Sequence, residues 1–142
     1  MSVMYQAGWP GCSFLHKKSL LLGLICYKCI LSDFLLGLMM IVRTWHGCVP
    51  VEFGEAFAVH LQNTGVQHSQ SIAGNAGAFV RRETQGQWEH FFLATYWHDL
   101  EAVIAFAGED YHVAVTYADD EQFQLLSDPY VFQFEVAAVV GI

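Results

Sequence analysis

The stretch FFLATYWHDLEAVIAFAGED, residues 91–110, carries an apolar strand directly into a helix. Its first seven residues are rich in the aromatic residues that favour strands, and they end at Trp97. Asp99 is a good N-cap for a helix, and Gly108 is a typical helix end. One face of the helix between them would carry Leu100, Val103, Ile104 and Ala107. The stretch therefore predicts a strand that is followed almost at once by an amphipathic helix.

The remaining elements of residues 40–142 can be placed by the same criteria. We expect strands at 40–46 and 130–140, two strands within 73–97 joined by a turn at 84–87, and a short helical turn at 110–117. We also expect a helix at 51–64, with Pro50 at its first position and Gly65 at its end. The order β-α-β-β-α-β predicts an α+β, ferredoxin-like domain with an antiparallel sheet.

Both faces of the predicted sheet are apolar. In the strand at 91–97, one side carries Phe91, Leu93, Thr95 and Trp97, and the other carries Phe92, Ala94 and Tyr96. A sheet that faces water on one side normally alternates apolar with polar residues. The helices of this fold cover only one face. Residues 1–39 could cover the other in part, but we expect a second copy to do so, giving a homodimeric barrel with a pocket in each half.

The charges divide the chain into two parts. Residues 1–39 have a net charge of +2, whereas residues 40–142 have a net charge of −10 and contain only three basic residues, Arg43, Arg81 and Arg82. The acidic part would repel a phosphate backbone, so we expect no nucleic-acid partner. The acidic run at 119–121 predicts a solvated loop. The four cysteines do not make a disulfide framework, which favours a reducing cytoplasm.

Residues 1–39 form an apolar extension with two open interpretations. Residues 19–40 are long enough to cross a bilayer, but Lys28 and Asp33 would lie near its middle at a cost of about 2.5–3.5 kcal/mol each. Residues 17–26 are similar to the start of a signal peptide, although no cleavage site follows them. We favour a functional chain that begins at Met39 or Met40, preceded by an over-extended reading frame or a dispensable arm. The alternative is a membrane arm, which would make the protein membrane-associated instead of cytoplasmic.

Four segments together resemble the antibiotic biosynthesis monooxygenase (ABM) family of dimeric α+β barrels: MIVRTWHG at 40–47, GNAGAFVRR at 74–82, HFFLATYWHDLEAVIAFAGED at 90–110 and DPYVFQFEV at 128–136. The resemblance covers nearly all of residues 40–142 and none of 1–39. It implies a small homodimeric oxidoreductase, a monooxygenase that needs no cofactor and oxidises a phenolic, quinol or polyketide-like aromatic. The alternative on the same barrel is a non-catalytic small-molecule-binding or stress-response module.

The sequence departs from the pattern of this family on the helix after Trp97. Many members carry a histidine there, and Phe106 lies where that histidine is expected. The haem-degrading branch has an Asn, Trp and His set, but Phe106 also takes the place of its tryptophan and the first strand has no asparagine. We therefore expect no haem. The histidines lack the spacing of metal ligands, so we expect no metal either.

Seven residues are candidates for the pocket. We assign catalytic roles to His46, which could act as a base, and to Arg43, which would hold a phenolate or carboxylate if it points inward. The candidate substrate-binding residues are Trp45, Tyr96, Trp97, Phe106 and Tyr117. Structural alternatives stay open, because large aromatics often only pack, buried tyrosines often bond a carbonyl and an outward arginine pairs with an acid. Arg81 and Arg82 lie on opposite faces of one strand, so at most one can enter the pocket.

Overall fold

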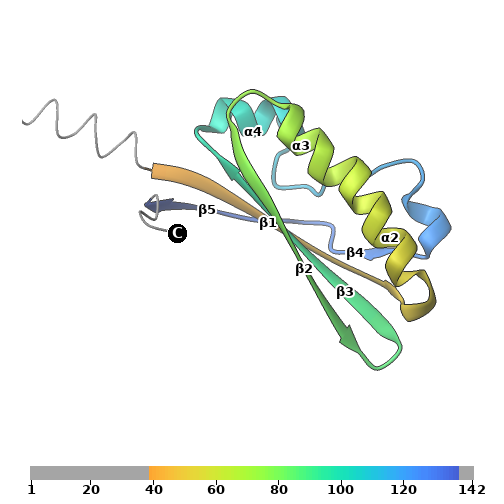
Figure 1. The fold of residues 1–142 in the computed structure, drawn as a ribbon. Helices are drawn as coiled ribbons and strands as arrows, with labels where there is room; N and C mark the ends of the chain where they lie inside the picture. The colour runs from red at the N-terminus through yellow and green to blue at the C-terminus, as the bar shows by residue number, and fades with distance from the viewer. Residues whose placement is uncertain (1–38, 138–142) are drawn as a thin grey trace, which may run out of the picture. The chain divides into compact units, whose positions relative to one another are not determined.

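The computed structural model describes residues 39–137, in which helices lie on one side of a sheet (Figure 1). The strands are β1 (Met39–Pro50), β2 (Asn75–Gln85), β3 (Trp88–Trp97), β4 (Leu126–Ser127) and β5 (Phe132–Ala137). Between β1 and β2, one continuous helical segment comprises the 3-10 turn η1 (Val51–Phe53), α2 (Gly54–Leu61), the π-helical η2 (Gln62–Val66) and α3 (Gln67–Ser71). Helix α4 (Leu100–Ala107) follows β3, and the 3-10 turn η3 (Asp120–Phe123) precedes β4.

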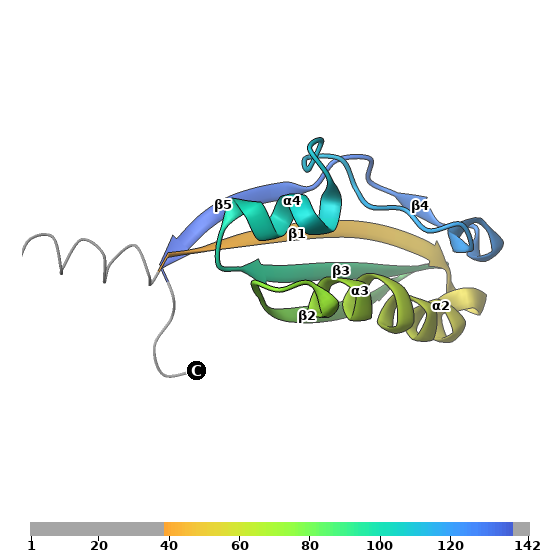
Figure 2. The same cartoon turned by 90° about the horizontal axis from the view of Figure 1, so that it is seen from above.

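The strand order of the described sheet is β2-β3-β1, with β4 and β5 both on the far side of β1. Every pair is antiparallel, and β5 and β4 pair with successive parts of β1. Seen from above, α4 lies along the half of the sheet that contains β1 and β5, and α2 with α3 lies along β3 and β2 (Figure 2). This arrangement confirms the predicted α+β, ferredoxin-like fold with an antiparallel sheet.

The junction between β3 and α4 has the predicted geometry. The Asp99 side chain accepts a hydrogen bond of 2.8 Å from the backbone N–H of Ala102, and Gly108 ends the helix with a positive φ. Trp97 is 0% exposed and packs against Val103 and Phe106. A buried aromatic at the end of the strand therefore holds the helix against the sheet.

The helix predicted at 51–64 is longer than expected, and the prediction that Gly65 ends it is wrong. The helical backbone continues through η2 and α3 to Ser71, and Ile72 leaves it in an extended conformation. Gly65 is buried, and a Cβ atom there would lie 3.2 Å from Leu61 Cδ1 and 3.3 Å from Leu93 Cδ2. The glycine therefore serves the close approach of helix and sheet and does not form a turn.

Other boundaries also differ from the sequence predictions. β1 runs on to Pro50, which ends a strand and does not occupy a first helical position. Residues 110–117 are not helical, because the carbonyls of Tyr111 and Val113 bond to an arginine side chain and Val113 forms a β-bridge with Tyr130. The last strand begins at Phe132 instead of Tyr130, and β4 has no counterpart among the predicted strands.

Some predictions fall on residues that lie outside the described part of the chain. These are the last three residues of the predicted strand at 130–140 and nearly all of the predicted extension at 1–39. Within residues 39–137, no helix combines the length and the apolar character needed to cross a membrane. The division into an extension at 1–39 and a domain at 40–142 stays a prediction.

Candidate functional site

A cavity lies between the sheet and its helices. Its apolar wall includes side chains from β1, α2, β3 and α4, namely Trp45, Phe57, Leu61, Leu93 and Phe106. Its polar groups are Arg43, Thr64, Thr95, Tyr117 and Asp120. The free volume is about 40 Å³, which is enough for about three water molecules. Aromatic walls with a few polar groups are typical of a small-molecule site, but a ring-sized ligand would require the walls to move outward.

Arg43 supplies the positive charge of this cavity. The residue is 4% exposed, and its guanidinium donates hydrogen bonds to the backbone carbonyls of Tyr111 and Val113, the second at 2.8 Å. It also lies 5.9 Å from the centre of the Phe106 ring. No carboxylate among residues 39–137 forms an ion pair with it. Burial lowers the pKa of Arg43 to about 10, so the side chain still carries its charge at neutral pH.

Tyr117 and Asp120 face the cavity from the segment that follows α4, and each contacts a histidine of the long helical segment. The Tyr117 hydroxyl lies 2.9 Å from His68 Nδ1, and Asp120 Oδ1 lies 2.7 Å from His60 Nε2. Asp120 Oδ2 accepts a hydrogen bond of 2.8 Å from the backbone N–H of Tyr117. Burial, with a smaller effect of the Asp120 charge, raises the pKa of Tyr117 to about 12. Its hydroxyl is therefore a neutral hydrogen-bond donor at neutral pH.

The two candidate tryptophans have different surroundings. Trp45 lines the cavity, and its indole N–H donates a hydrogen bond of 2.8 Å to Ser127 Oγ. Trp97 lies in the core beside the cavity, and its indole N–H donates to Thr95 Oγ1 at 2.8 Å. Thr95 in turn donates to the Arg43 carbonyl at 3.4 Å. Trp97 is not part of the cavity lining, but it contacts two residues that are, Thr95 and Phe106.

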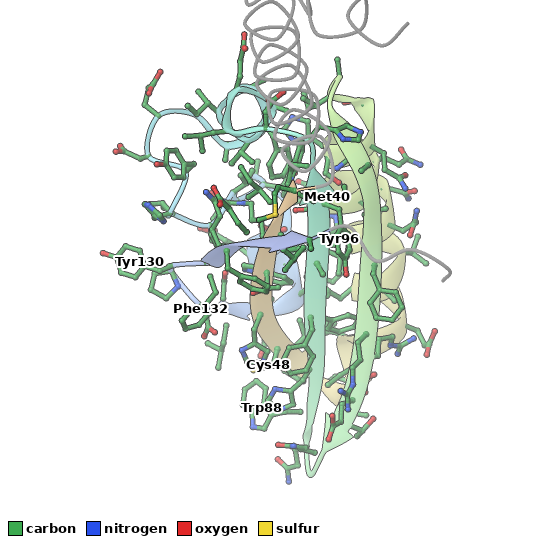
Figure 3. All side chains as sticks on the ribbon, turned by 90° about the vertical axis from the view of Figure 1, so that its left-hand side faces the viewer. Met40, Cys48, Trp88, Tyr96, Tyr130 and Phe132 are labelled. Carbon is green, nitrogen blue, oxygen red and sulfur yellow. The ribbon has the colours of Figure 1, made fainter. Side chains whose placement is uncertain are left out.

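The opposite face of the sheet carries a second group of polar side chains. His46 Nδ1 lies 3.0 Å from Asp128 Oδ2, and His46 Nε2 lies 2.9 Å from His90 Nδ1. The His46 ring is stacked on that of Phe92, with centres 4.7 Å apart. Beside them lies a hollow of about 540 Å³, whose exposed aromatic lining is Phe79, Phe92, Tyr130 and Phe132. Figure 3 labels two of these side chains, Tyr130 and Phe132. We call this face, which the helices leave uncovered, the open face.

The structure separates the two residues that the sequence proposes as catalytic. Successive side chains of a strand point to opposite faces, so Arg43 enters the cavity and His46 lies on the open face. They cannot serve one reaction centre within one subunit. Tyr96, whose direct neighbours across the strands are Val42 and Gly77, also lies on the open face. The cavity thus brings together four of the seven candidates, which are Arg43, Trp45, Phe106 and Tyr117.

Sequence reasoning missed Asp120, which lines the cavity, and the two histidines that contact lining residues, His60 and His68. The expectation of a solvated acidic loop is wrong for Asp120, whose side chain is 17% exposed. His68 falls outside the helix as the sequence predicts it, so no pattern placed it near His60. The partner of His68 is Tyr117, 49 residues further along the chain, and the partner of His60 is Asp120, 60 residues further along. Only the fold brings these pairs together. Among residues 39–137, no group of three or more His, Cys, Asp or Glu side chains could hold a metal ion.

The fold and the cavity define the class of this protein as a ferredoxin-like α+β domain with an internal cavity between its sheet and its helices. No protein-family model matches the sequence, and no curated protein matches it. Similarity to known proteins is therefore found only among solved structures.

Solved structures that are similar to this chain include two designated as antibiotic biosynthesis monooxygenases. The one from Nitrosomonas europaea has 13% identity over 73% of this chain and 93% of that chain, with a TM-score of 0.48. The one from Deinococcus radiodurans has 16% identity over 71% and 97%, with a TM-score of 0.49. A heme-degrader from Mycobacterium tuberculosis, MhuD, has 17% identity over 73% and 98%, with a TM-score of 0.42. The first two of these structures carry the name of the family that the sequence resembles. TM-scores below 0.5 assign no activity, and the fold class rests on the strand order itself.

Proposed function

We propose that this protein binds a small aromatic molecule with an anionic oxygen in the cavity and oxidises it with molecular oxygen, without a cofactor. The observation that carries the proposal is Arg43, a buried cation in the cavity wall with no carboxylate partner within residues 39–137. A buried charge without a counter-charge is costly even when carbonyls accept its hydrogen bonds, and an anionic ligand would offset that cost. The rings of Trp45, Phe57 and Phe106 favour an aromatic body for the same ligand.

A phenolic substrate can supply every electron that this reaction needs. After it loses a proton, the phenolate transfers one electron to O2 and combines with the superoxide that is formed. The resulting peroxide then loses water. With an anthrone as substrate, the ring CH2 group becomes a carbonyl group, one oxygen atom stays in the product and the other leaves in water. Atoms and electrons balance between substrate, O2, product and water, so the reaction requires no external reductant.

Arg43 and Tyr117 would stabilise the negative charge in this reaction. The Arg43 cation favours phenolate over phenol, and it therefore lowers the pKa of a bound phenol. The Tyr117 hydroxyl, kept neutral by its raised pKa of about 12, can donate a hydrogen bond to the same oxygen. The apolar walls would exclude water from the reactive oxygen species. Trp45 and Phe106 would contact the ring of the substrate.

One observation favours the alternative of a non-catalytic binding module. Proton removal from the substrate is fastest with a nearby acceptor. The carboxylate in the described cavity wall is that of Asp120, and both of its oxygens already accept hydrogen bonds. In this alternative, the same aromatic anion would be bound in the same cavity without turnover.

We further propose that the protein is a homodimer in which the open faces of two sheets meet. The support is the row of aromatic side chains that this face exposes, among them Phe79, Phe92, Phe132 and Phe134. A contiguous apolar surface of this kind is rare on a monomer, and a twofold dimer is the commonest way to cover it. The cavity with Arg43 lies on the other side of the sheet, so each copy would keep its own ligand site.

Binding of 2-naphthoate tests the ligand site, with 2-naphthamide as its uncharged analogue. We expect the wild-type chain to bind the anion at least about tenfold more tightly, because a hydrogen bond to a charged group is worth about 1.5–3 kcal/mol. Arg43→Gln should abolish this preference. Affinity for the anion should also fall above about pH 10, where Arg43 loses its proton, whereas Tyr117 stays neutral until about pH 12. Fluorescence titration over a pH series measures both effects.

The matched control for this titration is His46→Ala, which removes a polar side chain from the other face of the same strand. It should leave the preference for the anion and its pH dependence unchanged. Equal binding of naphthoate and naphthamide by the wild-type chain would contradict an anion site at Arg43.

Oxygen uptake distinguishes catalysis from binding alone. With anthrones, naphthols and hydroquinones, the catalytic proposal predicts uptake of one O2 per anthrone converted. Tyr117→Phe should lower the rate by about 100-fold or more, since removal of one donor to a developing oxyanion has an effect of that size. Tight binding of naphthoate without uptake above the rate in buffer would instead support the binding module.

A further inference from the structure

Residues 115–125 form the outer wall of the cavity, and we use that name for them below. Within the described residues, the backbone of the outer wall makes only local hydrogen bonds. They run from the Asp120 N–H to the Tyr117 carbonyl, from the Gln124 N–H to the Glu121 carbonyl and from the Tyr117 N–H to the Asp120 side chain. The side chains that it directs at the cavity are Val115, Tyr117, Asp120 and Leu125. A wall whose backbone is not bonded to the sheet or the helices must be held in place by side chains.

Two histidines of the long helical segment supply polar contacts that hold the outer wall. His60 bonds to Asp120 at 2.7 Å, and His68 lies 2.9 Å from the hydroxyl of Tyr117. Each imidazole also packs on an aromatic ring, since His60 lies 4.8 Å from Phe123 and His68 lies 4.8 Å from Phe106, measured between ring centres. The two histidines therefore contact the same two polar side chains that the outer wall presents to a ligand.

The π-helical segment η2 brings the two histidines onto one side of the helix. His60 and His68 are eight residues apart, and an ideal α-helix would place them about 80° apart around its axis. A π-helical turn accommodates one additional residue, and η2 lies between them. Position 68 therefore lies roughly where position 67 would lie in an uninterrupted α-helix. That place is only about 20° around the helix axis from His60. Thr64 and Gly65 of η2 line the cavity as well, so the irregular turn borders the site that it helps to shape.

We infer that His60 and His68 are positioning residues, which fix the location of Asp120 and the direction of the Tyr117 O–H bond. His60 Nε2 donates to one oxygen of Asp120, whose other oxygen accepts from the Tyr117 backbone. In the proposed arrangement, His68 carries its ring proton on Nδ1 and donates it to the Tyr117 oxygen 2.9 Å away, which leaves the phenolic proton free to bond to an anionic ligand. The direction of this proton rests on the proposed function, whereas the holding of the outer wall rests on the contacts alone.

Hydrogen exchange of the free full-length protein tests the holding of the outer wall without a ligand. We expect His60→Leu and His68→Leu each to speed exchange at the amides of Tyr117 and Asp120 by about tenfold or more, while amides in β3 keep their rates. His60→Gln and His68→Asn retain a polar group near the lost Nε2 and Nδ1 atoms, and they should restore slow exchange. Unchanged exchange in both leucine variants would overturn the inference.

A double-mutant cycle tests how His68 acts on the ligand, with 2-naphthoate as the probe. Tyr117→Phe and His68→Leu should each weaken binding about tenfold. The double variant should bind as Tyr117→Phe does, because His68 acts only through the hydroxyl that this variant lacks. Losses that multiply to about 100-fold would overturn the role of His68, and His46→Leu on the open face serves as a control without effect. If the wild-type chain does not bind 2-naphthoate, the proposed function fails, and the exchange experiment alone decides whether the histidines position the outer wall.

Discussion

Phe132→Asp is expected to convert the proposed dimer into a monomer at micromolar concentration. Phe132 is 78% exposed on the open face, at the edge of the hollow that Phe79 and Phe92 also line. In a twofold dimer, each copy would bury its Phe132 against the other, and burial of one phenylalanine contributes about 1.5–3 kcal/mol. The substitution acts in both copies and introduces charge, so the dissociation constant should rise at least about 100-fold. Sedimentation equilibrium of the full-length chain measures it.

Val59→Asp is the matched control for this experiment. Val59 is 63% exposed on α2, so the same change from an apolar residue to a carboxylate is made away from the open face. It should leave the dissociation constant within about threefold of the wild-type value, since surface substitutions usually have small effects. A wild-type chain that sediments as a single subunit at the same concentration would refute the dimer, whatever the variants do.

Trp97→Ala is expected to lower the free energy of unfolding by about 3–5 kcal/mol, the usual loss when a large buried aromatic is truncated. Trp97 is fully buried where β3 meets α4, and its ring lies 5.2 Å from that of Phe106. The variant would leave a void between the sheet and the helix and would remove the donor to Thr95. Urea unfolding measures the loss, and all variants must be compared at one protein concentration because association adds to stability.

Two other tryptophan variants separate the contributions to this loss. Trp97→Phe keeps most of the ring but removes the indole N–H, so it should cost less than Trp97→Ala. Trp88→Ala makes the same truncation at an exposed position next to the β2–β3 turn, and it should cost about 1 kcal/mol or less. Similar losses in Trp97→Ala and Trp88→Ala would show that the junction is not a main source of stability.

The parts of the fold that the sequence predicts are those in which local chemistry decides the structure. The β3–α4 junction is an example, because Asp99 caps the helix with its own side chain and Gly108 ends it within the same short stretch. The apolar character of the open face is another, since alternation along a strand assigns Phe92 and Phe132 to a face without any knowledge of their neighbours. In both cases the deciding interaction lies within a few residues.

The predictions that were wrong depend on contacts between distant segments. Gly65 has the signature of a helix end, but the close approach that favours a glycine there involves Leu93 as well as Leu61, and Leu93 belongs to a strand that the sequence cannot place beside it. The segment at 110–117 has helical character, but Arg43, 68 and 70 residues away, takes two of its carbonyls. The same holds for the candidate site, where alternation correctly separates neighbouring residues but cannot tell which face becomes the cavity.

The strand β1 contributes to the ligand cavity through Arg43 and Trp45 and to the open face through Thr44 and His46. Because the two sets occupy alternate positions, a single substitution can alter the proposed ligand site or the proposed dimer contact while leaving the other intact. Loss of one residue ahead of Arg43 would have a different outcome, since every later side chain of the strand would move to the opposite side. The guanidinium would then lie on the open face, in the proposed contact between subunits, and His46 would point into the cavity. Point substitutions in this strand can thus change the cavity and the open face separately, whereas a one-residue deletion would disrupt both faces at once.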